Sequence, residues 1–110
     1  MAEFRYQRFA EFWPHYLREH SRRHTRALHY MGTSIVVLLA VAALWTGRYW
    51  LFAAMPFAGY GFAWIAHIAV ERNRPATFTY PLWSFAADFR MWWLWLTFRL
   101  GGELRAAGVQ

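Results

Sequence analysis

The pattern of hydrophobic positions predicts two long helices in succession. Residues 27–47 contain no Asp, Glu, Lys or Arg, and residues 49–70 contain none either. Each run is long enough for a helix to cross the hydrocarbon core of a bilayer, which is about 30 Å thick. Only Arg48 separates the two runs. The pattern therefore predicts an antiparallel helical hairpin with a tight turn near residues 46–48.

The segments on either side of the hairpin are amphipathic or mixed. Residues 3–24 place five apolar side chains on one helical face, which predicts a helix lying in the membrane interface and bent at Pro14. On such a helix His20 and His24 would share the apolar face. Residues 76–100 are apolar but interrupted by charges, and we interpret them as interfacial or tilted membrane helices. The tail, residues 101–110, is predicted to be loosely ordered.

Composition assigns the chain to the membrane proteins. Of 110 residues, 58% are hydrophobic and 22% aromatic, more than a soluble domain of this size can bury. We therefore expect residues 1–110 to form a single all-α integral membrane domain. It would consist of an N-terminal amphipathic helix, a transmembrane hairpin and one or two further C-terminal membrane-associated helices.

Charge and cysteine content limit which binding partners and which kinds of reactive site the chain can have. The net charge is +6 and all twelve basic residues are Arg, most of them flanking the apolar runs. This placement favours contact with anionic lipid head groups over nucleic acid, and it predicts that both ends of the hairpin face the cytoplasm. The absence of cysteine excludes disulfides, thiolate metal sites and cysteine nucleophiles.

Folding the hairpin gathers histidines at one end. Mirroring the chain about its turn places His29 beside His67 and His24 level with Glu71, with His20 slightly further out. Imidazoles with a carboxylate are a ligand set for Fe(II), Zn(II) or Mn(II). The alternative is that interfacial histidines only hydrogen-bond to lipid or backbone. Because ionisable groups that converge within a membrane usually mark function, we favour a metal site.

Three further residues are candidates for supporting roles. Arg74 could bind a carboxylate group of a ligand, and Asn73 could orient that group. The segment around them is also typical of a helix end followed by a flanking arginine. Asp88 could be the hydrogen-bond partner of a metal-binding histidine.

Several short segments carry a resemblance to a known family. They occur in order as Tyr16-Leu17-Arg18-Glu19-His20-Ser21, Leu28-His29 with Gly32-Thr33-Ser34, Gly59-Tyr60-Gly61-Phe62-Ala63-Trp64-Ile65-Ala66-His67, Glu71-Arg72-Asn73-Arg74-Pro75-Ala76-Thr77-Phe78 and Asp88-Phe89-Arg90-Met91. Together they resemble the Mpo-type 2-hydroxy fatty acid dioxygenases, small membrane proteins that include many short bacterial members. The resemblance covers roughly residues 9–92.

The resemblance implies an Fe(II)-dependent dioxygenase that uses O2 to shorten a lipid-derived 2-hydroxy fatty acid by one carbon. It implies His20, His29 and His67 as ligands, with Glu71 as a fourth ligand or a neighbour, and it gives His24 second rank. In the mechanism that we expect, Arg74 or Arg26 neutralises the substrate carboxylate. The expected location is a bacterial inner membrane, with the N-terminus and the histidines on the cytoplasmic side.

Two other functions remain open from the residues alone. His29 and His67, level on adjacent helices, could be the axial ligands of a b-type haem. The chain could also be a lipid-binding membrane protein without catalytic activity. Two spans make a thin scaffold, which favours a homodimer.

Overall fold

The chain is all-helical over the residues that the structure describes. The computed structural model describes residues 6–109, with only the backbone of residue 77, and contains no strand there. The elements in order are α1 (Phe9–Arg18), α2 (Arg23–Thr46), α3 (Leu51–Ile65), the π-helical turn η1 (Ala66–Glu71), the 3₁₀ turn η2 (Ala76–Phe78), α4 (Pro81–Leu96) and α5 (Leu100–Ala106). The predicted all-α class is confirmed.

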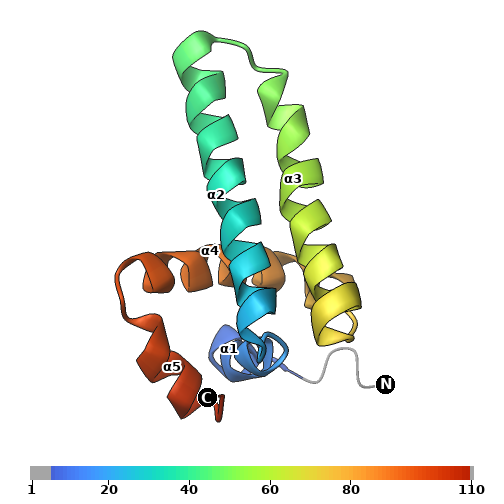
Figure 1. Cartoon of the computed structure of the whole chain (residues 1–110), viewed down its shortest axis with the longest axis vertical. Helices are drawn as coiled ribbons and strands as arrows, with labels where there is room; N and C mark the ends of the chain where they lie inside the picture. Colours follow the sequence, from blue (N-terminus) through green and yellow to red (C-terminus); the bar gives the residue numbers. More distant parts are fainter. Residues whose placement is uncertain (1–5, 110) are drawn as a thin grey trace.

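Helices α2 and α3 form the predicted hairpin and dominate the outline of the molecule (Figure 1). The turn begins at Gly47, whose φ of 72° lies in the left-handed region that glycine adopts without steric cost. Near the other end the helices approach closely at Gly32, where an added Cβ would lie 2.9 Å from the Cβ of Phe62. A glycine is therefore needed for this spacing.

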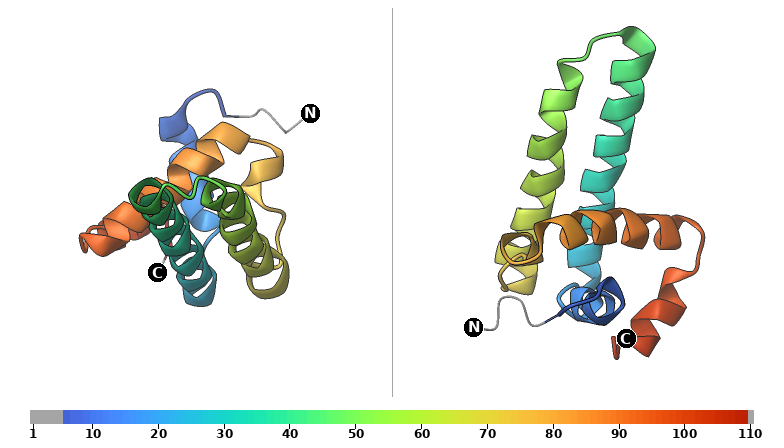
Figure 2. Two further views of the ribbon diagram at one scale, coloured as in Figure 1. Left: turned by 90° about the horizontal axis from the view of Figure 1, so that it is seen from above. Right: turned by 180° about the vertical axis from the view of Figure 1, so that it is seen from behind.

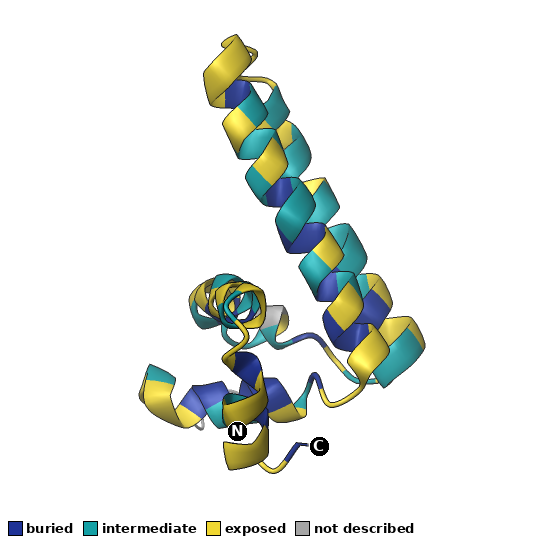
Figure 3. Ribbon diagram, turned by 60° about the vertical axis from the view of Figure 1, so that its left-hand side comes forward, coloured by how far each residue is buried: buried dark blue, intermediate teal, exposed yellow. Residues whose placement is uncertain are grey.

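The outer surface of the hairpin is apolar and largely uncovered. Both Arg23–Thr46 and Leu51–Glu71 are long and apolar enough to cross a membrane. Large side chains near the turn and along α3 are exposed, with Trp45 at 88% and Phe57 at 80%. Figure 3 shows exposed and partly exposed residues over most of the hairpin, with buried residues concentrated towards the opposite end. Such a surface suits contact with lipid rather than with water.

The main hydrophobic core lies at the open end of the hairpin. There α4 runs across the hairpin and α1 and α5 pack beneath it (Figure 2). The core consists of buried residues from these three helices and the segment after α5: Phe12, Trp13, Tyr16, Leu17, Ala87, Met91, Leu100, Leu104, Ala107 and Val109. Helix α4 crosses the axis of the hairpin instead of running along it (Figure 2).

The N-terminal helix is shorter than the predicted 3–24. Residues 3–5 lie outside the described part of the chain, and α1 ends at Arg18. His20 lies in the turn that follows, and His24 lies in the first turn of α2 and is exposed. The prediction that these two histidines share one helical face is therefore wrong. A turn separates the two helices between these histidines, with Arg22 in an extended conformation (ψ 139°).

Residues 101–109 of the C-terminal tail are largely helical and packed against the other helices, which corrects the prediction of a loosely ordered tail. Leu100 and Leu104 are one helical turn apart on α5 and both are buried in the core. The Nε1 of Trp13 donates a hydrogen bond to Glu103 over 2.7 Å, and Arg90 forms an ion pair with the same carboxylate at 3.7 Å. These contacts hold α5 against α1 and α4.

Candidate metal centre

Three histidines from three segments meet beside the open end of the hairpin. His20 comes from the turn between α1 and α2, His29 from α2, and His67 from η1. The Nε2 atom of His20 lies 3.1 Å from that of His29 and 3.0 Å from that of His67. The Nε2 atoms of His29 and His67 are 3.3 Å apart. All three side chains are buried.

This triangle has the dimensions of a three-nitrogen metal site. With metal–nitrogen bonds of about 2.1 Å, neighbouring nitrogens are about 3.0 Å apart on one face of an octahedron and about 3.4 Å apart in a tetrahedron. The three Nε2 separations fall in this interval. The histidines therefore fit an ion that keeps further positions for other ligands, and they form a group that could hold a metal.

The other ring nitrogen of each histidine faces an acceptor. The Nδ1 of His20 lies 2.6 Å from the carbonyl oxygen of Tyr16. The Nδ1 of His67 lies 2.6 Å from Oδ1 of Asn73, and the Nδ1 of His29 lies 3.4 Å from Oδ1 of Asp88. A carbonyl, an amide oxygen and a carboxylate accept hydrogen bonds, so these neighbours favour the tautomer in which Nδ1 carries the proton. In that tautomer the three Nε2 lone pairs converge on one point, as the ligands of a metal ion do.

Burial sets the charge state of the surrounding groups. Desolvation is the main reason that the pKa of His20 lies well below its usual value, so the imidazole stays neutral and able to bind a metal. Desolvation also raises the pKa of Tyr16, with the charge of Asp88 as the next cause. The Tyr16 hydroxyl therefore keeps its proton and donates a hydrogen bond to Asp88.

The segment after His67 fastens the turn that carries His20. The helix widens to a π turn over Ala66–Glu71, and the N–H of Asn73 bonds back to the carbonyl of His67 at 2.9 Å. The Nδ2 of Asn73 donates to the carbonyl of Glu19 over 3.0 Å. One side chain thus orients His67 and holds the residue preceding His20. Such π turns frequently occur at functional sites.

Glu71 also holds the turn that carries His20, through the two residues that follow His20. Its carboxylate accepts hydrogen bonds from the Ser21 hydroxyl at 2.7 Å and from the Arg22 N–H at 2.8 Å. Arg22 precedes the first residue of α2, where an anion also interacts favourably with the helix dipole. The structure therefore engages Glu71 at the start of α2, and the group of three histidines forms without it.

The remaining predicted residues lie outside the triangle. His24 is exposed. Arg26 is buried, and its Nη1 donates to the carbonyls of His20 and Ser21 at 2.8 and 2.9 Å. Arg74 is exposed, with its guanidinium 5.3 Å from the centroid of the Phe78 ring. Arg26 thus supports the turn of His20, and neither arginine lines the two cavities next to the histidines.

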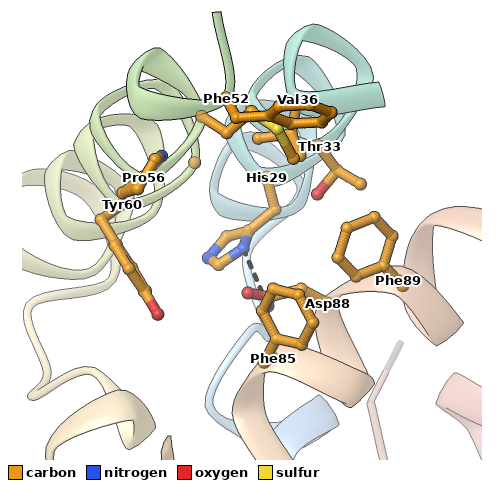
Figure 4. A pocket seen from close by; sticks show the side chains of 11 residues that line it. His29, Thr33, Val36, Phe52, Pro56, Tyr60, Phe85, Asp88 and Phe89 are labelled. Carbon is orange, nitrogen blue, oxygen red and sulfur yellow. Dashed lines mark ion pairs between the residues drawn. The ribbon is translucent and has the colours of Figure 1, made fainter. Parts of the chain in front are cut away.

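Two cavities adjoin the histidines. A small one of about 10 Å³ is lined by all three rings together with Tyr16, Ser84 and Asp88 among others. A larger one of about 340 Å³ lies between the hairpin and α4, with mostly apolar walls. His29 and Asp88 line both, and Figure 4 shows their ion pair at the edge of the larger cavity. A ligand in the apolar cavity would therefore lie beside His29 and Asp88.

Two residues of the site were missed from the sequence. Tyr16 contributes a main-chain oxygen to His20, which no side-chain pattern reveals, and its hydroxyl reaches Asp88. Ser84 lines the small cavity, but a single serine in an apolar helix carries no signal of its own. Both depend on how α1 and α4 pack against the hairpin.

A comparison with protein families matches residues 6–100 of the chain to the family described as 2-hydroxy-palmitic acid dioxygenase Mpo1-like. The chain belongs to this family. A search of curated proteins and a search of solved structures found no match. The Mpo1-like match spans every segment described above as part of the metal centre, from α1 to α4.

Proposed function

We propose that this protein is an Fe(II)-dependent dioxygenase that shortens 2-hydroxy fatty acids by one carbon. The observation that carries the proposal is the convergence of three Nε2 atoms whose Nδ1 partners are all acceptors. Membership of the 2-hydroxy-palmitic acid dioxygenase Mpo1-like family supports the reaction class.

The three histidines would hold the iron. When bound, Fe(II) would supply the O2 chemistry of the reaction, and three protein nitrogens leave room for ligands other than protein. Tyr16, Asn73 and Asp88 would keep the rings in the orientation and tautomer that binding requires. Glu71 would act by holding the turn that carries His20.

The apolar cavity suits the acyl chain of the substrate. Its volume of about 340 Å³ lies within the ordinary range for ligand pockets, about 300–1,000 Å³. Phe52 and His67 are fifteen positions apart in sequence, which corresponds to about 20 Å along the helix axis at about 1.5 Å per residue. The lining extends from His29 to Phe52 (Figure 4). An extended chain placed here would run parallel to the hairpin and direct its polar end towards the histidines.

We further propose that the hairpin spans a membrane, with the site at the cytoplasmic face of a bacterial inner membrane. The length and uncovered apolar surface of the two helices support insertion. In the sequence, six arginines precede the first apolar run and two closely follow the second, whereas one lies between the runs, which supports this orientation. A fatty acid would reach the cavity directly from the lipid.

Geometry counts against the haem alternative. Axial nitrogens on opposite sides of a haem iron are about 4 Å apart, twice a metal–imidazole bond, with the macrocycle between them. The Nε2 atoms of His29 and His67 are 3.3 Å apart, and His20 lies against both. The cavity that these rings share is about 10 Å³, too small for a porphyrin.

Metal analysis and turnover test the proposal together. Protein purified without O2 should contain one equivalent of iron after loading, and His67→Ala should lose it. His24→Ala is the matched control, because His24 is exposed and outside the triangle, and it should bind iron as the wild type does. The loaded wild type in lipid nanodiscs should consume O2 with 2-hydroxypalmitate and release a product one carbon shorter.

The outcomes separate the metal site from the reaction. Iron that binds equally to wild type and His67→Ala would refute the site. Stoichiometric iron without O2 consumption on 2-hydroxy acids of any chain length would refute the activity, and it would leave lipid binding as the better function. A Soret band in the purified protein would favour haem instead.

A further inference from the structure

Ser84 is a buried hydroxyl without a hydrogen-bond partner. The residue is 4% exposed, and its Oγ forms no hydrogen bond with the described residues. Its backbone N–H is satisfied by the carbonyl of Tyr80 at 2.8 Å. An unpaired buried hydroxyl destabilises a fold unless water or a ligand completes its bonding.

The position of Ser84 indicates what such a ligand would be. Ser84 lies in the first turn of α4 and lines the small cavity together with the three metal-ligand candidates. The volume of about 10 Å³ is about that needed for one water-sized group. The cavity therefore has space for a small ligand and one unpaired hydroxyl beside it.

The other polar groups around this cavity are engaged. The Nδ1 atoms of the histidines face Tyr16, Asp88 and Asn73, and the Tyr16 hydroxyl donates to Asp88. Among the described residues that line the cavity, Ser84 is thus the hydroxyl that remains able to donate. A serine hydroxyl can turn its proton towards a negatively polarised oxygen.

We propose that the Ser84 hydroxyl donates a hydrogen bond to the small oxygen ligand that binds next to the three histidines, and so positions it. This inference rests on the metal site proposed above. Ser84 would contact the small ligand itself, because it lines the cavity next to the histidines. Tyr16, Asp88 and Asn73 instead contact the Nδ1 atoms of the histidine rings. Removing its hydroxyl should therefore change ligand binding and leave metal binding unaltered.

Nitric oxide, a diatomic analogue of O2, is the probe. Wild type and Ser84→Ala are loaded with Fe(II) without O2 and titrated with nitric oxide, followed by absorption and electron paramagnetic resonance. We expect equal iron content, about fivefold weaker nitric oxide binding in Ser84→Ala, and a changed resonance spectrum. The matched control is Ser34→Ala. The Ser34 hydroxyl accepts a hydrogen bond of 3.0 Å from Trp92 Nε1, and Ser34 does not line the small cavity. It should bind nitric oxide like the wild type.

The metal-free proteins give a second measurement. Because Ser84→Ala removes an unpaired buried hydroxyl and introduces a better helix former, metal-free Ser84→Ala should be at least as stable as metal-free wild type. Equal nitric oxide affinity and spectra in wild type and Ser84→Ala, with iron bound to both, would overturn the role of Ser84 alone. A metal-free Ser84→Ala that is clearly less stable would show that the hydroxyl has a structural partner and would also overturn it. A wild type that binds no iron would overturn this inference together with the metal site.

Discussion

Replacing Asn73 tests how the site is held together. In Asn73→Ala, the Nδ1 of His67 loses its acceptor at 2.6 Å and the carbonyl of Glu19 loses its donor at 3.0 Å. Loss of the partner of a metal-binding histidine typically lowers metal affinity 10- to 100-fold, and we expect a decrease in this range. Two lost hydrogen bonds at about 1 kcal/mol each should also lower the free energy of unfolding by about 2 kcal/mol.

Asn73→Asp separates the two effects. An aspartate keeps an acceptor for His67 but cannot donate to Glu19, so it should retain metal affinity within about threefold and still lose about 1 kcal/mol or more of stability. Metal affinity is measured by competition with a chelator, and stability by denaturant unfolding of the metal-free protein. If Asn73→Ala binds iron as tightly as the wild type, the hydrogen bond to His67 does not orient the ring and the reasoning is refuted.

Three further predictions address charge and packing. Burial lowers the pKa of His20 from its usual 6.5, so below about pH 6.5 the unfolded chain binds a proton that the folded chain does not. Metal-free protein should therefore lose stability as the pH falls through this value. A free energy of unfolding that stays constant between pH 8 and 5 would contradict this prediction. Gly32→Ala would force a Cβ against Phe62 and should destabilise the hairpin by about 1–3 kcal/mol in thermal unfolding, whereas Gly61→Ala, which meets nothing within 4 Å, should not. Met91→Ala empties a fully buried position in the core and should cost about 2–5 kcal/mol, while iron binding measured at low temperature stays intact.

The sequence was sufficient to predict the hairpin and one side of the site. The two charge-free runs specify two helices, and the single Arg48 between them leaves antiparallel pairing as the simple solution. Once paired, the runs bring His29 and His67 to the same level, and their Nε2 atoms indeed lie 3.3 Å apart. The proximity of His29 and His67 was predictable because the rise per residue is constant in a helix, so sequence position gives the position along the hairpin axis.

The supporting groups could not be predicted in this way. His20 reaches the other histidines only because the chain turns after Arg18, and that turn is held by Glu71 and Asn73, about fifty residues away. For Glu71 the sequence left open a ligand or a neighbour of the site, and in the structure its two oxygens accept hydrogen bonds from the turn. Side-chain type does not reveal whether a carboxylate faces a metal or a helix start, because both favour an anion.

The distribution of the ligands links metal binding to tertiary packing. Two of the histidines belong to the hairpin, whereas His20 and the groups on α1 and α4 belong to the layer beneath it. The main core lies within that layer, and the hairpin buries little of its own surface. Because an ion held by all three rings binds only when the two parts are docked, its binding free energy adds to the stability of their docking. With Nδ1 protonated in all three rings and no ion present, the Nε2 lone pairs would face one another at 3.0–3.3 Å and oppose the same arrangement. A metal held by the three histidines would thus join the hairpin to the layer beneath it in addition to its part in the reaction, and the contacts of Tyr16, Asn73 and Asp88 would orient the three rings for it.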